Sequence, residues 1–268
     1  MTEVEVSLRG RHVYLRPTTP GDYEFLFNIE IAAEAAPRWR FRGLTLSFEQ
    51  FVHVLHEDVL VSFIAIDIET ERPLGSVMAY SADFRNDLAS IAAIAAPDQI
   101  GSGRIIEGVG LLVDYVFGYW TFRKLYLQTF DFNLSQFIGL RGVLREEARL
   151  PDYEFYLGRY WDKVFLSISR TAWTDFRQLV LAPPVNGHAS ILDFDGLVAL
   201  LARDLDWDLP VDVNADLAKD CELDSLTLFA FFAMLEDYVG ALMPNGVRNQ
   251  MSTLGDAFHW YRTRLEAT

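Results

Sequence analysis

The feature that most constrains this chain is an interruption at Leu181–Ser190, where Pro183-Pro184 and Asn186-Gly187 replace the periodic pattern of apolar residues. Clusters of Pro, Asn and Gly of this kind are typical of loops and linkers. A chain of 268 residues is also longer than one average domain. We therefore predict two domains, at residues 1–181 and 191–268, joined by a linker at residues 182–190.

Composition and charge exclude several classes of protein. Hydrophobic residues make up 51% of the chain, which is typical of a globular protein. The net charge of −15 repels a phosphate backbone, so we expect no nucleic-acid partner. The single cysteine, Cys221, cannot form an internal disulfide, and no Cys/His spacing indicates a metal site. No secretory signal and no apolar stretch of about 20 residues is present, so we expect a cytoplasmic protein without a membrane partner.

The N-terminal part mixes strands and helices in an order that does not repeat as βαβ units. The turn at Glu69–Pro73 predicts an antiparallel hairpin between its two flanking strands. We predict strands at His12–Arg16, Val61–Ile68, Leu74–Tyr80, Ala89–Ala96 and Lys124–Phe130, a hairpin within Tyr153–Ile168 that turns near Leu157-Gly158, and helices that begin at Pro20, span Ser47–Leu55 and span Ile105–Phe117. The pattern therefore indicates a mixed α/β (α+β) fold with a central antiparallel run.

The C-terminal part has only helical periodicity. Apolar residues recur at helical spacing in Leu192–Leu205, Ser225–Val239 and Thr253–Leu265, and an acid-rich loop separates the first two. Residues 186–268 hold 14 acids against 5 bases, so this part is the more acidic of the two. We predict a small all-α helical bundle with one long loop.

A glycine turn follows the predicted strand Ala89–Ala96. Gly101-Ser102-Gly103 lies directly before a helix, where backbone N–H groups and the helix N-terminus can hold a phosphate. A plain strand-to-helix turn is the alternative for such a short motif. Neighbouring segments add context to it: Val13-Tyr-Leu-Arg-Pro17 with Gly21-Asp22, Arg72-Pro-Leu-Gly75, Pro97 through Glu107, Arg123-Lys-Leu-Tyr126, Asn133 with Ser135, and Gly158-Arg-Tyr-Trp-Asp162 ending at Trp173.

In these ordered segments, roughly residues 5–175, the chain resembles the GNAT acetyltransferase family, most closely its ribosomal-protein N-acetyltransferase branch. The resemblance implies a mostly antiparallel sheet flanked by helices and an acyl-CoA cofactor, with acetyl-CoA as the first candidate. It places the pyrophosphate of CoA on Ile100, Gly101, Ser102, Gly103 and Arg104, and the pantetheine arm beside Ala95 and Ala96. It also implies a role at the thioester for Asn133, with Ser135 beside it, although Asn133 equally suits a helix N-cap.

Some positions depart from that family. Asp98 stands where the family usually has Gln or Arg, and Val143-Leu144 replaces its Gly-Phe pair. The strand Ser90–Ala96 has no carboxylate to act as a base, and Gly139 aligns with the tyrosine that acts as an acid in other members. An acceptor that is already nucleophilic would suit such a site. For each candidate for a relocated acid or base, a solvated loop charge or a packed ring is the preferred interpretation; the candidates are Asp83, Asp87, His53, His56, Tyr153 and Tyr156.

The C-terminal part contains Asp224-Ser225-Leu226 at a predicted helix start. An aspartate before the serine can cap the helix, and a phosphate on the serine would lie at the positive end of the helix dipole. The tripeptide stands in a longer frame that runs from Val213 through Leu226 and continues with Leu235-Glu-Asp-Tyr-Val-Gly240, Pro244 and Ser252-Thr-Leu-Gly-Asp256.

Over residues 188–265 this frame resembles acyl carrier proteins. The resemblance implies 4'-phosphopantetheine attached to Ser225 by a phosphopantetheinyl transferase. Cys221, four residues before this serine, is expected to be buried support and not a nucleophile. The acids could dock on the basic face of an adenylating or synthase enzyme, or simply be solvated; they are Glu222, Asp224, Glu236 and Asp237.

A GNAT-like domain joined to a carrier favours transfer between the two, because linkage raises the local concentration to the order of mM. The leading hypothesis is an N-acyltransferase of natural-product biosynthesis that moves an acyl group from CoA to a small substrate tethered on Ser225. One alternative is loading of the pantetheine thiol itself, with or without decarboxylation. The other is a non-catalytic docking module on a dedicated carrier.

Overall fold

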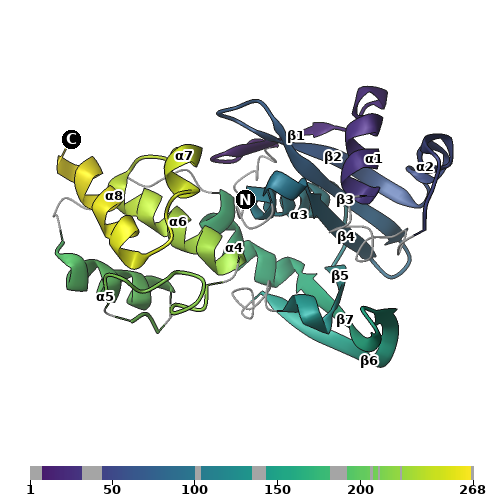
Figure 1. Ribbon diagram of the computed structural model, residues 1–268. Coiled ribbons are helices and arrows are strands. Elements are labelled where there is room, and N and C mark those ends of the chain that lie inside the picture. Colours follow the sequence, from purple (N-terminus) through teal and green to yellow (C-terminus); the bar gives the residue numbers. More distant parts are fainter. Residues whose placement is uncertain are drawn as a thin grey trace.

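The computed structural model describes residues 8–31, 44–99, 104–134, 143–181, 192–205, 208–210, 212–223 and 225–266. In this part of the chain, a twisted seven-stranded sheet carries helices on its faces, and a group of helices lies beside it (Figure 1). We call residues 8–181 the sheet unit and residues 192–266 the helical bundle.

Every strand of the described residues belongs to the sheet unit. They are β1 (Val13–Pro17), β2 (Val59–Asp67), β3 (Pro73–Asp83), β4 (Leu88–Ala95), β5 (Lys124–Phe130), β6 (Leu144–Tyr156) and β7 (Arg159–Ser169). Its helices are α1 (Tyr23–Ile31), α2 (Phe48–Val54), α3 (Arg104–Tyr119) and α4 (Arg170–Leu181), with short 3-10 helices at Pro20–Asp22 and Pro97–Gln99. The helices of the bundle are α5 (Phe194–Leu205), α6 (Ser225–Val239), α7 (Asn245–Arg248) and α8 (Leu254–Glu266).

The strand order is β1-β2-β3-β4-β5-β7-β6, and every neighbouring pair is antiparallel except β4 and β5. The predicted mostly antiparallel sheet is therefore confirmed. The second hairpin turns at Leu157-Gly158 as predicted, where both residues have positive φ. Its first strand, β6, begins earlier than predicted, at Leu144, because the exposed outer edge of the sheet needs no apolar alternation to form.

Helices cover the two faces of the sheet with separate apolar cores. Leu111, Leu112 and Val116 of α3 pack against Val13, Phe63 and Val77 on one face. Successive side chains of a strand point to opposite faces of the sheet. On the other face, α1 and α2 therefore pack on the alternate residues, such as Ile64 of β2 and Ile94 of β4. The strong apolar side of α3 explains why the sequence predicted this helix well.

The bundle has an apolar core of its own, formed by α5, α6, α8 and the loop before α6. Its three long helices lie where helical spacing predicted them, while α7 was not predicted because it has only four residues. Cys221 is buried in this core as expected. Burial and the nearby carboxylates of Asp220 and Asp216 raise its pKa to about 11, so this residue is a thiol at neutral pH.

The two units share apolar packing. Helix α6 lies against α3 and α4, and Phe229 of α6 is buried within the core of the sheet unit together with Trp173. The sequence did not predict α4, which supplies one side of this junction. Two links hold α4 on α3: Trp173 Nε1 donates to Asp114 at 3.2 Å, and Arg177 Nη2 donates to Asp114 at 2.9 Å. The predicted linker at residues 182–190 lies outside the described residues.

Neither a membrane span nor a metal cluster was found in the described part of the chain. None of its helices combines the length and apolar character that a membrane crossing needs. No group of three His, Cys, Asp or Glu side chains in the same part is placed to hold a metal ion.

One ion pair at the start of the fold predicts a measurable pH effect. Arg16 Nη1 donates to Asp22 at 2.7 Å, and the Thr19 N–H donates to the same carboxylate at 2.8 Å. Hydrogen bonding to Arg16 lowers the pKa of Asp22 from 3.8 to about 2. A lowered pKa stabilises the folded state above the unfolded-state pKa, and this stability is lost as pH falls through the folded-state pKa.

Asp22→Asn should therefore lower the free energy of unfolding by about 1–2 kcal/mol at pH 6, after allowance for solvent at the half-exposed Arg16. The difference from the wild type should shrink as pH falls from 4 toward 2. Urea unfolding at pH 6 and pH 2.5 measures both values, and the exposed Glu57→Gln is the control. A difference that is the same at both pH values would contradict the prediction.

Candidate functional site

The sheet opens between its two parallel strands. Strands β4 and β5 pair only from Leu88–Ser90 to Lys124–Tyr126, although β4 continues to Ala95 and β5 to Phe130. Beyond Ser90, β4 keeps its antiparallel pairing with β3. The backbone groups of β4 that point away from β3 are therefore not used by β5 in the described part of the chain. An extended chain with amide groups, such as a pantetheine arm, can hydrogen-bond to a strand edge of this kind.

Ala95 and Ala96 lie at the far end of this opening, as the sequence predicted for residues beside the arm. Ala95 is half-buried and opposes Gly75 of β3. Gly75 allows the two strands to approach closely, because a Cβ at this position would lie 2.1 Å from the Ile94 carbonyl oxygen. Ala96 is buried among the side chains under α1 and α2, and its N–H donates to the Leu74 carbonyl at 2.8 Å. Ala95 is therefore the better placed of the two to border a ligand.

Helix α3 begins at Arg104, directly after the glycine turn. Ile100, Gly101, Ser102 and Gly103 lie outside the described residues. The Arg104 side chain is 3% exposed and forms an ion pair with Asp67 at 3.3 Å. The Arg104 guanidinium is thus paired with a carboxylate at the end of β2. A pyrophosphate would instead suit the backbone N–H of Arg104, which lies at the positive end of the α3 dipole.

Asp98, the acid that departs from the family pattern, is exposed in the 3-10 helix Pro97–Gln99. Its carboxylate accepts a hydrogen bond from the Gln99 side chain at 3.1 Å. The negative charge of Asp98 is thus exposed to solvent, and the Gln99 side chain donates one hydrogen bond to it.

Asn133 lies in a short turn at Asp131–Leu134 that follows β5 on the opposite side of the opening. It is half-buried next to Phe132, whose ring contacts Trp161 with centroids 4.8 Å apart and Tyr156 at 5.6 Å. This aromatic group fixes the turn against the β6–β7 hairpin. Ser135 and Gly139 lie outside the described residues, so the roles of Asn133 and Ser135 remain predictions.

The candidate relocated acids and bases are scattered. Asp83 accepts from the Arg85 and Asn86 N–H groups, which together with the Asn86 side chain lowers its pKa. Asp87 accepts from Thr121 at 3.1 Å. His56 bonds to the Tyr23 hydroxyl at 2.9 Å, while His53 is exposed on α2. Tyr153 is 46% exposed on β6, the outer edge strand, and Lys163 lies over its ring at 4.9 Å. These contacts favour structural roles for the loop acids.

Two hydroxyl side chains that the sequence analysis did not select lie where the opening begins. Tyr80 of β3 stands directly opposite Ser90 of β4 in the antiparallel ladder. A lone serine in an apolar strand gives no sequence signal of its own, in contrast to a carboxylate.

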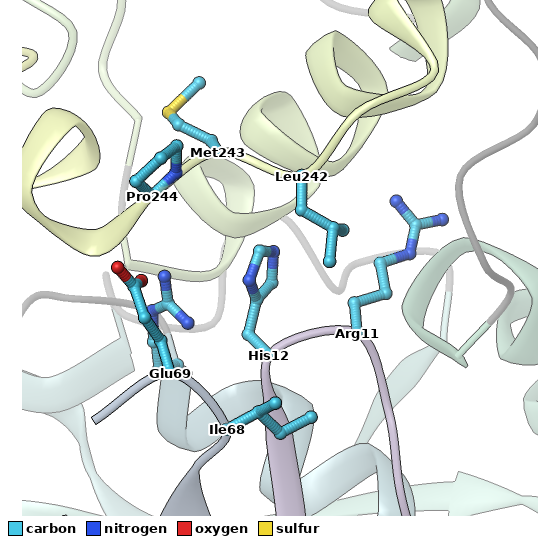
Figure 2. A pocket seen from close by; sticks show the side chains of 8 residues that line it. Arg11, His12, Ile68, Glu69, Leu242, Met243 and Pro244 are labelled. Carbon is cyan, nitrogen blue, oxygen red and sulfur yellow. The ribbon is translucent and has the colours of Figure 1, made fainter. Parts of the chain in front are cut away.

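A buried charged cluster joins the sheet unit to the bundle. His12 Nε2 lies 2.7 Å from Glu236 of α6, and Arg11 Nη1 lies 3.1 Å from Asp237. Glu107 of α3 accepts from the His12 N–H at 3.0 Å, and its burial raises its pKa. Figure 2 shows the pocket between these elements, lined by Arg11, His12, Ile68 and Glu69 on one side and by Leu242, Met243 and Pro244 on the other.

Arg248 of α7 completes this cluster. It is 4% exposed and lies over the Phe232 ring at 4.7 Å and the Phe229 ring at 5.5 Å. Burial and the charge of Arg104 lower its pKa to about 10, and the carboxylates of Glu236 and Glu107 oppose that shift. It remains charged at neutral pH.

The acids expected to face a partner enzyme have different environments. Glu236 is 1% exposed and Asp237 pairs with Arg11, so this part of the acidic face lies against the chain's own sheet unit. Glu222 is exposed, and Asp224 lies outside the described residues. Helix α6 begins at Ser225, about one turn before Phe229 of the junction. The predicted attachment point is therefore close to the sheet unit.

Comparison with known proteins supports the fold of the sheet unit. The sequence matches no family model and no curated protein significantly. Among solved structures, spermidine N-acetyltransferase from Vibrio cholerae in complex with CoA and spermine matches with a TM-score of 0.52 and 22% identity, over 61% of this chain and 98% of its own. Two point mutants of that enzyme match over 96% of their length, with TM-scores of 0.53 and 0.52 and identities of 22% and 23%.

At this level of identity, what is shared is the fold. The sheet unit of this chain therefore has the fold of the spermidine N-acetyltransferases, which is the GNAT fold.

Proposed function

We propose that the protein is an acyl-CoA-dependent acyltransferase, with acetyl-CoA as the first donor to test. The observation that carries this proposal is the opening of the sheet past Ser90, followed directly by the positive end of α3. Together these offer a strand edge for the amides of pantetheine and a helix start for its pyrophosphate. The solved structure with CoA and spermine shows that the same fold binds CoA in another protein.

The helical bundle is proposed to be a carrier domain with 4'-phosphopantetheine on Ser225. In support, a long helix, a loop and a second helix that begins at this serine follow one another, and a short helix and a last helix complete the unit. The acceptor would be an amine or another nitrogen nucleophile tethered to this arm, as in natural-product biosynthesis. Because the two units are joined, the tethered substrate would reach the site at an effective concentration on the order of mM.

If the acceptor is already nucleophilic, the protein has only to orient the acceptor and the thioester toward each other. Holding the thioester and the acceptor together can supply about 7–11 kcal/mol of the barrier. The protein would bind the arm along β4, hold the pyrophosphate at α3 and exclude water between α1, α2 and the aromatic group at Phe132. A separate phosphopantetheinyl transferase would attach the arm. An adenylating or synthase enzyme would load the substrate onto the arm and would dock on acids that are exposed, such as Glu222.

Loading of the pantetheine thiol itself is a second candidate. Strand β4, Leu88–Ala95, carries no carboxylate to deprotonate an ammonium. Exchange of one thioester for another needs less of such a base, because a thiol ionises closer to neutral pH than an amine. Mass spectrometry of the acylated protein separates the two, since only this route leaves the acyl group on the arm without any tethered cargo.

Acyl-CoA binding to the opening can be tested by filling it. Ala92→Phe places a ring on β4 beside the gap, and we expect it to weaken acetyl-CoA binding by about tenfold or more. Titration calorimetry with acetyl-, malonyl- and propionyl-CoA measures the affinity, and Ala148→Phe on the exposed strand β6 is the matched control. Wild-type protein that takes up none of the three donors would favour the non-catalytic docking module over an enzyme.

A further inference from the structure

One side of helix α6 carries its contacts with the sheet unit. Phe229 packs in the core of the sheet unit, and the Ala233 carbonyl accepts a hydrogen bond from Arg11 Nη1 at 3.1 Å. Asp237 lies 3.1 Å from the same nitrogen, and Glu236 is 1% exposed. These four α6 positions are spaced i, i+4, i+7 and i+8, so they lie on one side of the helix. We call them the docking stripe.

Other residues of α6 belong to the bundle. Phe231, Leu235 and Tyr238 are buried in the apolar core that α6 shares with α5 and α8. A helix that is apolar on several sides is buried on several sides, and here the sheet unit covers one of them (Figure 1). If the bundle moved away from the sheet unit, the docking stripe would gain solvent exposure and present one aromatic ring and two acids.

The position of Ser225 on α6 continues the docking stripe. It precedes Phe229 by four residues, which places the two positions on the same side of the helix, about 6 Å apart along its axis. A specific protein interface covers about 800 Å² of each partner, which corresponds to a patch about 16 Å in radius. An enzyme that binds around position 225 therefore has to occupy part of the surface that the sheet unit covers.

We propose that the docking stripe is the surface by which the bundle binds the enzyme that attaches phosphopantetheine, and that the sheet unit competes for this surface. This inference rests on the carrier domain proposed above. In the attachment step the Ser225 hydroxyl loses a proton and bonds to the phosphorus that carries pantetheine, while adenosine 3',5'-bisphosphate leaves CoA. The docked bundle is shielded from this step, so attachment takes place before docking or during a transient release.

The contacts at the stripe define both the partner and the cost of release. A competing enzyme needs a basic group for Asp237 and Glu236 and an apolar recess for Phe229, which is what the sheet unit provides. Release unpairs Arg11 and His12 from their carboxylates and exposes the Phe229 ring, so the released state is a minor population. The enzyme binds only that population, and the rate of attachment follows its size.

Arg11→Ala tests the proposal without changing the bundle itself. We expect phosphopantetheine to attach to the full-length apo variant at least about tenfold faster than to the apo wild type, because truncating one partner of a buried charge pair weakens an interface by that much or more. The rate is followed by intact mass with CoA and a limiting amount of a broad-specificity phosphopantetheinyl transferase. Arg11→Lys, which keeps the charge, should fall between the two. The matched control is Arg149→Ala on the exposed strand β6, which should be modified at the wild-type rate.

Small-angle X-ray scattering gives a second readout. Arg11→Ala should have a larger radius of gyration than the wild type while its circular dichroism spectrum stays unchanged, as expected for release of a folded bundle. Attachment that is no faster in Arg11→Ala and Arg11→Lys than in the wild type would overturn the competition and leave the carrier function standing. If neither the wild type nor any variant gains phosphopantetheine, the carrier function and this inference are both wrong.

Discussion

Ser225→Ala is expected to abolish covalent attachment of phosphopantetheine, because the serine hydroxyl is the nucleophile in the proposed modification. The wild type, treated with CoA and a broad-specificity phosphopantetheinyl transferase, should gain one phosphopantetheine by intact mass. Helix α6 begins at this residue, where the phosphate would meet the positive end of the helix dipole.

Ser252→Ala, in the same bundle and just before α8, is the matched control and should be modified normally. Acetyl-, malonyl- and propionyl-CoA added to the holo wild type then show whether an acyl group reaches the arm without other enzymes. If the arm attaches but no donor charges it, self-loading is excluded and a tethered nitrogen acceptor remains. If the wild type gains no arm at all, the carrier assignment is wrong.

Glu236→Ala should lower the free energy of unfolding by about 3–5 kcal/mol, the range for removal of one partner from a buried ion pair. The Glu236 carboxylate lies 2.7 Å from His12 Nε2 and accepts from the Met243 N–H at 2.9 Å. It also lies 3.8 Å from Arg11 Nη1. Without this carboxylate, the buried Arg11 guanidinium loses a nearby negative charge and the Met243 N–H loses its acceptor.

Chemical denaturation measures this effect. Glu266→Ala, which removes an exposed pair with Arg262, should change the free energy of unfolding by no more than about 0.5 kcal/mol. Because the junction joins the units, Glu236→Ala should also separate one unfolding transition into two. A single transition at the wild-type midpoint would show that the cluster does not hold the bundle to the sheet.

The packing of the bundle on the sheet unit bears on the proposed carrier function. A carrier that swings freely on a linker would expose its acidic helix, whereas here Phe229 is buried in the sheet unit and Glu236 is covered. Such burial is costly to undo, since it would expose apolar surface and unpair charges. In the proposed function, delivery of a tethered substrate to the opening between β4 and β5 would then depend on movement of the phosphopantetheine arm more than on movement of the bundle.

Local patterns in the sequence determined most of the elements. Alternation predicted the strands around the Glu69–Pro73 turn, and helical spacing predicted α3, α5, α6 and α8, because each side chain's burial follows from its place in one strand or helix. The position of the glycine turn between β4 and α3 likewise needed no tertiary information. Helix α4 and the long edge strand β6 were missed, since their formation depends on α3 and β7 beside them.

The sequence by itself predicted a division into two units, with strands and helices mixed in the first and only helices in the second. Only the tertiary structure decided which residues meet. Arg104 pairs with Asp67, Glu236 pairs with His12 across 224 positions of the chain, and β4 separates from β5 after Ser90. Periodicity records which face of an element is buried, but the partner of a buried charge or hydroxyl depends on strand register and on docking between units, which no local pattern encodes.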